Sequence, residues 1–151
     1  MIKGLHHSAY RCRDSGETRE FYEDFLGLPL AGILEINESM TGRETKVLHT
    51  FFEMGDGSYL AFFEAPDQPF EFKDQHDYDL HIALEVDDET LQKMFEKGKA
   101  QDVETPGIAD DGLRKSLCFR APNGYDIELA EETDVHPHST DREKHSASQH
   151  R

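Results

Sequence analysis

The chain has 151 residues, a length that suits one domain with a hydrophobic core of its own. Its 32 acidic residues outnumber its 16 basic ones, and the net charge of −16 excludes partners that need a basic face, such as nucleic acid or an anionic membrane. No apolar run approaches the roughly 20 residues of a membrane span, and the start lacks the apolar stretch of a signal peptide. We therefore expect a cytoplasmic protein with reduced Cys12 and Cys118.

The first half is predicted to form a strand, a helix and three strands. Alternating or helically spaced apolar residues place these elements at 5–12, 17–26, 30–36, 47–54 and 58–64. Asp14 or Ser15 is the expected cap of the helix. The loop 65–77 that follows carries Phe70 and Phe72, which we expect to form a lid or to pack at a subunit boundary.

The second half repeats this order of elements. Strands are predicted at 79–86, from Val103, at 113–120 and at 125–130, with a capped helix over 90–99 and a loop over 106–112. The last segment, 132–151, is polar and has no aromatic side chain, which predicts a disordered tail. We interpret the histidines of this tail as incidental: His136, His138, His145 and His150.

Both halves thus have the order βαβββ, which predicts an α+β fold made of paired modules at about 1–66 and 78–131 within one domain, 1–131. The helices should cover one face of a curved, mostly antiparallel, cup-shaped sheet. The other face would then be concave and available for a site.

Three residues stand at the non-apolar phase of short alternating strands: His7, His81 and Glu128. Two imidazoles and one carboxylate on inner sheet faces match the ligand set of an open Fe(II)-type site. A carboxylate that faces inward beside apolar strands is costly unless it is paired, and a divalent cation would offset that cost. By the same alternation, His6 is expected on the face opposite to His7 and is interpreted as structural.

The stretches that carry these residues are Leu5-His6-His7, Leu80-His81-Ile82-Ala83, and Pro122-Asn123-Gly124-Tyr125 followed by Ile127-Glu128-Leu129. They resemble the vicinal oxygen chelate superfamily, which includes glyoxalase I, extradiol dioxygenases, methylmalonyl-CoA epimerases and fosfomycin-resistance enzymes. The resemblance implies that His7, His81 and Glu128 bind a divalent metal, with Fe(II) first and Mn(II) or Zn(II) as alternatives. It also implies a small-molecule substrate and a homodimer.

The chain departs from the patterns of particular subfamilies. Glyoxalase I and the epimerases have a Glu ligand or base where this chain has Ala61, and alternation places Glu64 on the wrong face to replace it. Extradiol enzymes need only two His and one Glu, but Cys118 stands where they usually have an acid–base Tyr. His49 is a candidate for their second-sphere histidine. We therefore take His49 and Cys118 as the catalytic candidates.

Alternation also predicts residues that contact the substrate. If Ala61 and Cys118 face the cup, so do Tyr59 and Phe63, which could stack on an aromatic ring, and Arg114 and Arg120, which could pair with a carboxylate: these four are the substrate-binding candidates. The first hypothesis is an extradiol-type, ring-cleaving dioxygenase acting on a small catechol. The alternatives are a lyase or isomerase of glyoxalase type, and a non-catalytic protein that sequesters a ligand as bleomycin-resistance proteins do.

Overall fold

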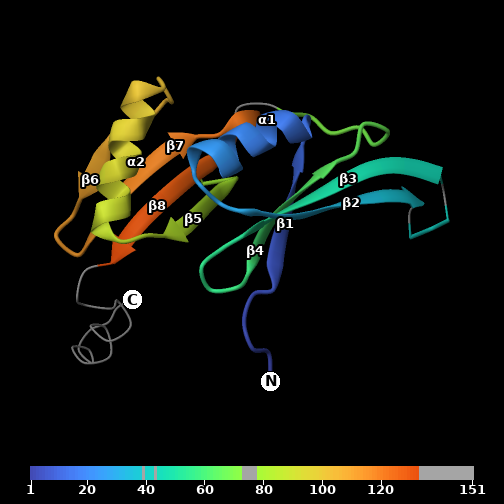
Figure 1. Cartoon of the computed structure of the whole chain (residues 1–151), viewed down its shortest axis with the longest axis horizontal. Helices are drawn as coiled ribbons and strands as arrows, with labels where there is room; N and C mark the ends of the chain where they lie inside the picture. Colours follow the sequence, from blue (N-terminus) through green and yellow to red (C-terminus); the bar gives the residue numbers. More distant parts are fainter. Residues whose placement is uncertain (39, 43, 73–77, 133–151) are drawn as a thin grey trace. The chain divides into compact units, whose positions relative to one another are not determined.

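The computed structural model describes residues 1–38, 40–42, 44–72 and 78–132 (Figure 1). The predicted tail, 132–151, begins one residue too early, because Glu132 ends a strand; its other residues, with the four histidines, lie outside the described ones. The chain divides into two compact units. Unit 1 comprises Met1–Asp74 and Ala121–Gly124, and unit 2 comprises Gln75–Arg120 and Tyr125–Arg151. No helix among the described residues is long and apolar enough to cross a membrane.

Unit 1 contains a four-stranded sheet and one continuous helical segment. Its elements are β1 (His7–Cys12), α1 (Ser15–Arg19), the π-helix η1 (Glu20–Phe25), β2 (Leu30–Glu38), β3 (Glu44–Glu53) and β4 (Tyr59–Glu64). The strand order is β1-β4-β3-β2, in which β1 runs parallel to β4 and the other pairs are antiparallel. The predicted helix over 17–26 therefore begins earlier, behind the cap Asp14, and its second half is wound as a π-helix.

The core of unit 1 lies between this helical segment and one face of the sheet. The Tyr22 ring lies 4.6 Å from Phe62 and 6.0 Å from Phe52, measured between ring centroids. All three side chains are almost fully buried. Because strand side chains alternate, the residues next to Phe62 and Phe52 in sequence face the other way, where they are free to build a site.

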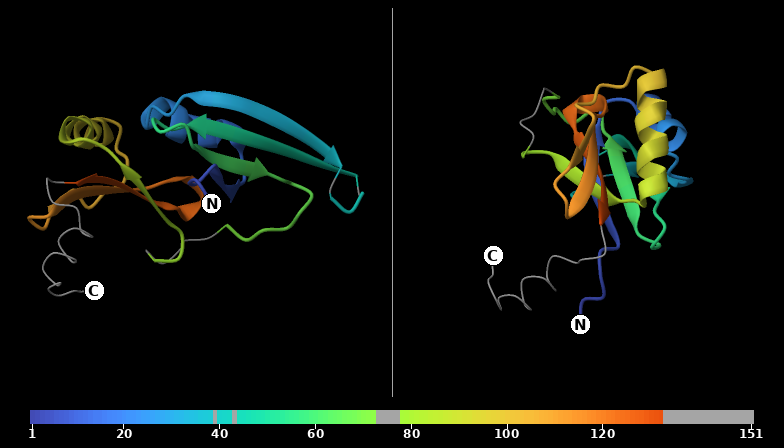
Figure 2. Two further views of the ribbon diagram at one scale, coloured as in Figure 1. Left: turned by 90° about the horizontal axis from the view of Figure 1, so that it is seen from below. Right: turned by 90° about the vertical axis from the view of Figure 1, so that its left-hand side faces the viewer.

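Unit 2 has the same order of elements. They are β5 (His81–Glu85), α2 (Asp88–Ala100), β6 (Ile108–Asp110), β7 (Arg114–Arg120) and β8 (Asp126–Glu132), and the 3-10 turn η2 (Pro122–Gly124) before β8 belongs to unit 1. The strand order is β5-β8-β7-β6, with β5 parallel to β8. Figure 2 shows α2 lying along one face of this sheet, where it packs on β7 and β8 and buries Leu91 and Met94.

The α+β class and the paired βαβββ order are thus confirmed, but one strand was predicted in the wrong place. Val103 is not in a strand: its N–H bonds to the carbonyl of Gly98 and closes the end of α2, while Asp102 before it takes a left-handed conformation with φ of 56°. The third strand of the module is instead β6, which lies inside the predicted loop 106–112. Because β6 is only three residues long, alternation gave no signal for it.

Candidate functional site

His81 and Glu128 come from neighbouring strands of unit 2 and share the sheet face that α2 does not cover. In the parallel pair of β5 and β8, His81 is the partner of Asp126, and Ala83 is the partner of Glu128. Ile127, between the two acidic residues, is fully buried on the opposite face. The pattern of the sequence therefore places the imidazole and both carboxylates on one surface.

Each nitrogen of the His81 ring bonds to a different carboxylate. His81 Nδ1 lies 2.8 Å from Asp126 Oδ2, and His81 Nε2 lies 2.7 Å from Glu128 Oε1. Partial burial disfavours a charge on the ring, but the hydrogen bonds and negative charges of Asp126 and Glu128 outweigh it and raise the pKa of His81. The arrangement thus favours a positive charge between the two carboxylates.

Asp126 is a residue that the sequence analysis did not select. It is 7% exposed, whereas an unpaired aspartate is rarely buried to this degree. The sequence did contain one signal that could have identified Asp126: it is two residues from Glu128, so both must point to the same side of a strand. Whether Asp126 would reach the histidine together with Glu128 depended on the register of β5 against β8, which a single sequence does not contain.

Two further candidates line a cavity of about 400 Å³ in unit 2, next to Asp126. In the antiparallel pair of β7 and β8, Cys118 is the partner of Glu128 and Arg120 is the partner of Asp126. Cys118, Arg120 and Asp126 all contribute to the wall of the cavity. Arg114, at the other end of β7, is exposed and does not line it. Of the two predicted arginines, Arg120 is therefore the one placed beside this cavity.

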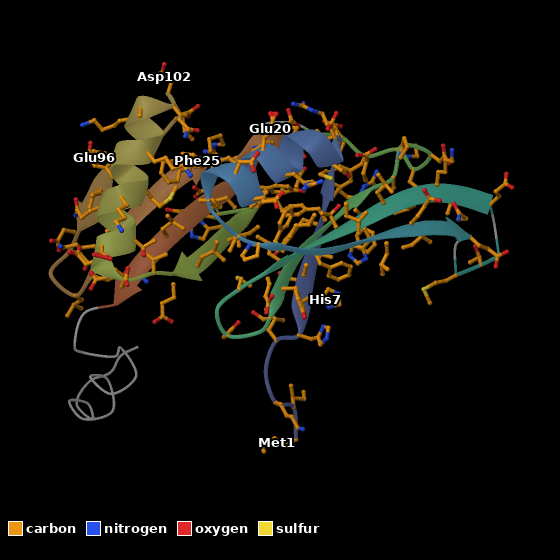
Figure 3. All side chains as sticks on the ribbon, in the orientation of Figure 1. Met1, His7, Glu20, Phe25, Glu96 and Asp102 are labelled. Carbon is orange, nitrogen blue, oxygen red and sulfur yellow. The ribbon has the colours of Figure 1, made fainter. Side chains whose placement is uncertain are left out.

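The predicted site residues of unit 1 lie on the face of its sheet opposite the helical segment. His7, labelled in Figure 3, stands at the start of β1, and its ring centroid lies 5.6 Å from Phe51 and 6.1 Å from His49. His49 stacks on Phe63 at 3.7 Å with an interplanar angle of 18°. Tyr59 is the strand partner of His7. Four predicted residues, His7, His49, Tyr59 and Phe63, thus share this face.

His49 is enclosed by aromatic rings. The residue is only 7% exposed, and its Nε2 is buried without a hydrogen-bond partner. Burial, with a smaller contribution from the charge of His7, lowers the pKa of His49. The ring is therefore held in its neutral form, which has one nitrogen able to accept a proton.

The position of His6 differs from the prediction. Its Nδ1 lies 2.8 Å from Nδ1 of His7, and its ring lies 5.8 Å from Tyr59. The prediction of an opposite face was wrong because β1 begins only at His7, so strand alternation does not extend to His6. His6 is a hydrogen-bonding neighbour of the candidate ligand.

The sequence profile of the Glyoxalase/Bleomycin resistance protein/Dioxygenase superfamily matches residues 4–129. The chain belongs to this superfamily. No curated protein matches the sequence at a significant level.

Solved structures of this superfamily share the fold at low sequence identity. The fosfomycin resistance protein FosX from Listeria monocytogenes superposes with a TM-score of 0.66 at 22% identity, over 89% of this chain and 97% of FosX. A glyoxylase/bleomycin resistance protein/dioxygenase domain from Frankia has a TM-score of 0.71 at 15% identity, over 88% of this chain and all of that one. A glyoxalase/dioxygenase from Nostoc punctiforme has a TM-score of 0.65 at 19% identity, over 87% of this chain and 92% of that one.

Within the superfamily, the structure explains why this chain cannot use a ligand from the middle of β4. Ala61 is fully buried between its strand partners Ala9 and Phe51. Glu64 lies on the helix side of the sheet, where its carboxylate accepts a hydrogen bond of 2.5 Å from the Ser15 N–H. The predicted orientation of Glu64 is confirmed, and its role is to hold the start of α1.

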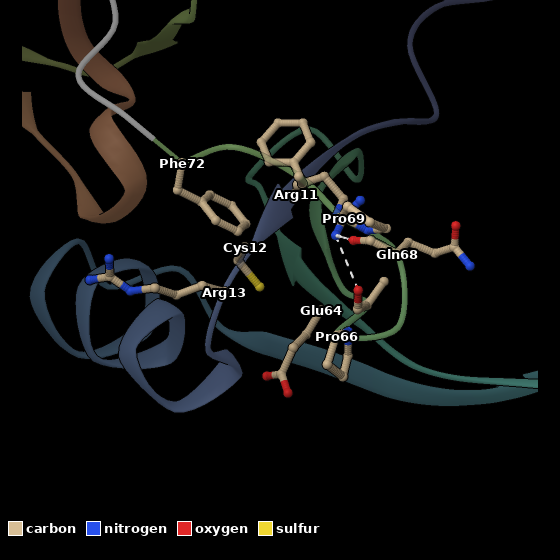
Figure 4. A pocket seen from close by; sticks show the side chains of 10 residues that line it. Arg11, Cys12, Arg13, Glu64, Pro66, Gln68, Pro69 and Phe72 are labelled. Atoms are coloured by element: carbon tan, nitrogen blue, oxygen red, sulfur yellow. Dashed lines mark hydrogen bonds between the residues drawn. The ribbon is translucent and has the colours of Figure 1, made fainter.

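Hydrogen bonds and a ring contact from Arg11 hold the loop after β4 against β1 (Figure 4). The Arg11 guanidinium donates to the carbonyls of Ala65 and Gln68 at 3.1 and 2.7 Å and lies 4.9 Å from the centre of the Phe70 ring. Phe70 in turn packs on Phe72 at 4.9 Å. These contacts border a cavity of about 250 Å³ in unit 1. The predicted lid and subunit boundary both remain hypotheses for this loop.

The donor set of unit 2 fits part of a metal site. An imidazole nitrogen and a carboxylate oxygen 2.7 Å apart are ligand types that Fe(II), Mn(II) and Zn(II) accept. Within the described residues of either unit, no group of three or more His, Cys, Asp or Glu side chains could hold a metal ion. His81 and Glu128 therefore need at least one further ligand.

Proposed function

We propose that this protein is a metal-dependent enzyme in which His7, His81 and Glu128 bind one divalent cation. The observation that carries the proposal is the 2.7 Å approach of Glu128 Oε1 to His81 Nε2 on the sheet face opposite α2, where the Glu128 side chain is 12% exposed. Removing a carboxylate from water is costly, and a cation beside it offsets the cost. His7 belongs to the other unit and enters the proposal through the superfamily pattern alone.

Fe(II) is the metal that we propose, and Mn(II) or Zn(II) would suit the same donors. Crystal structures of Listeria monocytogenes FosX, a member of the same superfamily, contain Mn(II). A bound Fe(II) would supply Lewis-acid activation of two neighbouring substrate oxygens and an open position for O2. The residues around it would bind and orient the substrate and move its protons.

The reaction that we propose is ring cleavage of a small catechol by O2. Two histidines and one glutamate suffice for it, so the buried Ala61 is no obstacle. Tyr59 and Phe63 would contact the aromatic ring of the substrate, although one face of Phe63 is already covered by His49. Arg120, with Arg114 as the second candidate, would pair with a carboxylate on the substrate.

Within this proposal, His49 Nε2 accepts the proton of a substrate hydroxyl. Support comes from its buried, unpartnered Nε2 and its lowered pKa, because both leave a neutral ring that lacks an internal partner. Cys118, the strand partner of Glu128, is the second catalytic candidate. A thiol is a weaker hydrogen-bond donor than the phenol that extradiol enzymes usually have there.

Two observations favour a second candidate function, a metal-dependent reaction of a small anionic substrate without O2. Cys118 replaces the acid–base Tyr, and Arg120 lines the cavity beside Asp126. One FosX structure contains Mn(II) with 1S,2S-dihydroxypropylphosphonic acid, which is an anionic compound with adjacent oxygens. The glyoxalase-type lyase is disfavoured by Ala61, and metal-free sequestration of a ligand is disfavoured by the pairing of His81 with Glu128.

The test uses the full chain purified without a chelating column and loaded with Fe(II). We expect about one bound iron per chain and, with catechol or 2,3-dihydroxybiphenyl under air, a yellow ring-opened product. His81→Ala and Glu128→Gln should each lower turnover by about 100-fold or more. Glu85→Gln is the matched control, because Glu85 is on the same strand and phase as His81 but is exposed at its far end.

Other outcomes would replace the proposal. Metal binding with no coloured product from any catechol, but with turnover of a methylglyoxal–thiol adduct or of an epoxide phosphonate, would establish the second class of reaction. Ligand binding without metal or turnover would establish a sequestering protein. Sizing of the same sample in solution checks the homodimer that the resemblance implies.

A further inference from the structure

We infer that Asp126 is a positioning residue that holds the proton of His81 on Nδ1, so that Nε2 is directed to the metal. This inference rests on the proposed function, because it assigns the metal to the side of the ring that faces Glu128. It adds a residue that neither the sequence analysis nor the superfamily comparison selected.

The geometry gives Asp126 a fixed place beside the ring. Asp126 and His81 are direct partners in the β5–β8 ladder, and the Asp126 N–H bonds to the carbonyl of Leu80 at 2.9 Å. The carboxylate reaches His81 Nδ1 at 2.8 Å, and its side chain is 10% exposed. A short side chain on a paired strand has few ways to move, so its oxygen stays at the Nδ1 edge.

Glu128 has a longer side chain than Asp126, and this difference separates the roles of the two carboxylates. Its longer side chain has one more rotatable bond, so Oε1 can move from His81 Nε2 to a cation bound at that nitrogen. The lone pairs of Nδ1 and Nε2 diverge in the plane of the ring, so a cation at Nε2 is out of reach of the oxygen at Nδ1. Asp126 is therefore left to hold the Nδ1 proton.

A buried carboxylate on the second nitrogen of a ligand histidine has two effects. It selects the tautomer with the proton on Nδ1 and makes Nε2 a stronger donor to the metal. Loss of such a partner typically weakens metal binding by about 10-fold to 100-fold. A purely structural Asp126 would affect the stability of the fold and leave the tautomer of His81 unchanged.

The experiment compares the full-length protein with Asp126→Asn, which keeps the shape of the side chain and removes its charge. Asp79→Asn is the matched control, because it makes the same change at an exposed position close to His81. The first measurement is ¹⁵N NMR of the histidine rings in metal-free protein at alkaline pH. We expect His81 to carry its proton on Nδ1 in the wild type and in Asp79→Asn, and to shift toward Nε2–H in Asp126→Asn.

The second measurement is the affinity for Mn(II), by calorimetry or electron paramagnetic resonance. We expect about 10-fold to 100-fold weaker binding in Asp126→Asn and no change in Asp79→Asn. If the wild type binds Mn(II) and Asp126→Asn binds it equally well, or if wild-type His81 carries its proton on Nε2, the inference is overturned and the proposed function stands. If the wild type binds neither Mn(II) nor Fe(II), the proposed function fails and the inference fails with it.

Discussion

At the scale of single residues, the two best-placed histidines have opposite surroundings. His49 is enclosed by the rings of Phe51 and Phe63, at 4.2 and 3.7 Å, and its pKa is lowered. His81 is held between two carboxylates, and its pKa is raised. In the proposed function, the neutral ring of His49 would accept a proton, and the negative surroundings of His81 would favour a cation.

The surroundings of His49 predict a conflict between stability and activity. A buried nitrogen without a partner costs about 1–3 kcal/mol, so His49→Phe, which completes the aromatic stack, should raise the free energy of unfolding by about 1 kcal/mol. The same variant should lower turnover by about 100-fold or more, because the proposed proton acceptor is gone. Urea unfolding and the catechol assay measure the two effects.

The control for this prediction is His6→Phe, which changes an exposed histidine next to the same group. It should give no gain in stability, since the His6 ring is exposed to water and its Nδ1 already has a partner in Nδ1 of His7. A His49→Phe protein that is less stable than the wild type would show that Nε2 has a partner in solution. Full turnover in that variant would exclude His49 as the proton acceptor.

At the scale of elements, local rules predicted most of the fold. Alternating apolar residues located β1, β5, β7 and β8 and assigned the faces of His7, His81 and Glu128. The helix caps were predicted correctly, because Asp14 and Asp87 each accept a bond from a backbone N–H in the first turn, although both helices begin two residues before the predicted starts. What local rules missed depends on pairing between distant segments: β6 exists only through its ladder with β7, and His49 is enclosed only through the register of β3 with β4.

The same limit applies to the candidate site. The sequence placed His81 and Glu128 on one face but could not show that Asp126 reaches the other ring nitrogen, since that requires the parallel register of β5 and β8. It also could not separate Arg114 from Arg120, which have the same phase in β7. Only the ladder with β8 shows that Arg120 is opposite Asp126.

The backbone conformation of Asp102 at the C-terminal end of α2 predicts a stabilising substitution. Asp102 has φ of 56°, and the bonds Asp102 N–H to Lys99 O and Val103 N–H to Gly98 O complete a Schellman motif around it. A left-handed residue with a side chain is strained, and a negative charge at a helix C-terminus is unfavourable. Asp102→Gly should therefore raise the free energy of unfolding by about 0.5–1 kcal/mol in urea titrations.

Two further variants separate the causes of that gain. Asp102→Asn removes the charge and tolerates the left-handed conformation, so it should fall between the wild type and glycine. Asp102→Ala removes the charge but keeps the backbone strain, and it should be the least stable of the three variants. An alanine variant as stable as the glycine variant would mean that charge alone determines the stability of this helix end.

At the scale of the whole molecule, the net charge is concentrated in residues 1–132. Residues 133–151 contain three acidic and three basic side chains, so residues 1–132 carry the entire net charge of −16. A field of this sign raises the local concentration of divalent cations, which suits the metal-dependent enzyme that we propose. The same charges repel one another in the compact state, so they lower its stability while they attract cations.

The unfolding temperature of the metal-free protein should therefore rise with salt. Going from about 10 mM to about 0.15 M NaCl shortens the Debye length from about 30 Å to about 8 Å, and we expect a gain of about 1 kcal/mol, or about 3 °C. Glu35→Lys, at an exposed position of β2, should raise the unfolding temperature at low salt and reduce the increment that salt gives. A fall in unfolding temperature with salt would mean that ion pairs such as Arg13–Glu17 outweigh the net repulsion. Such exposed pairs contribute little, because water and ions already screen them.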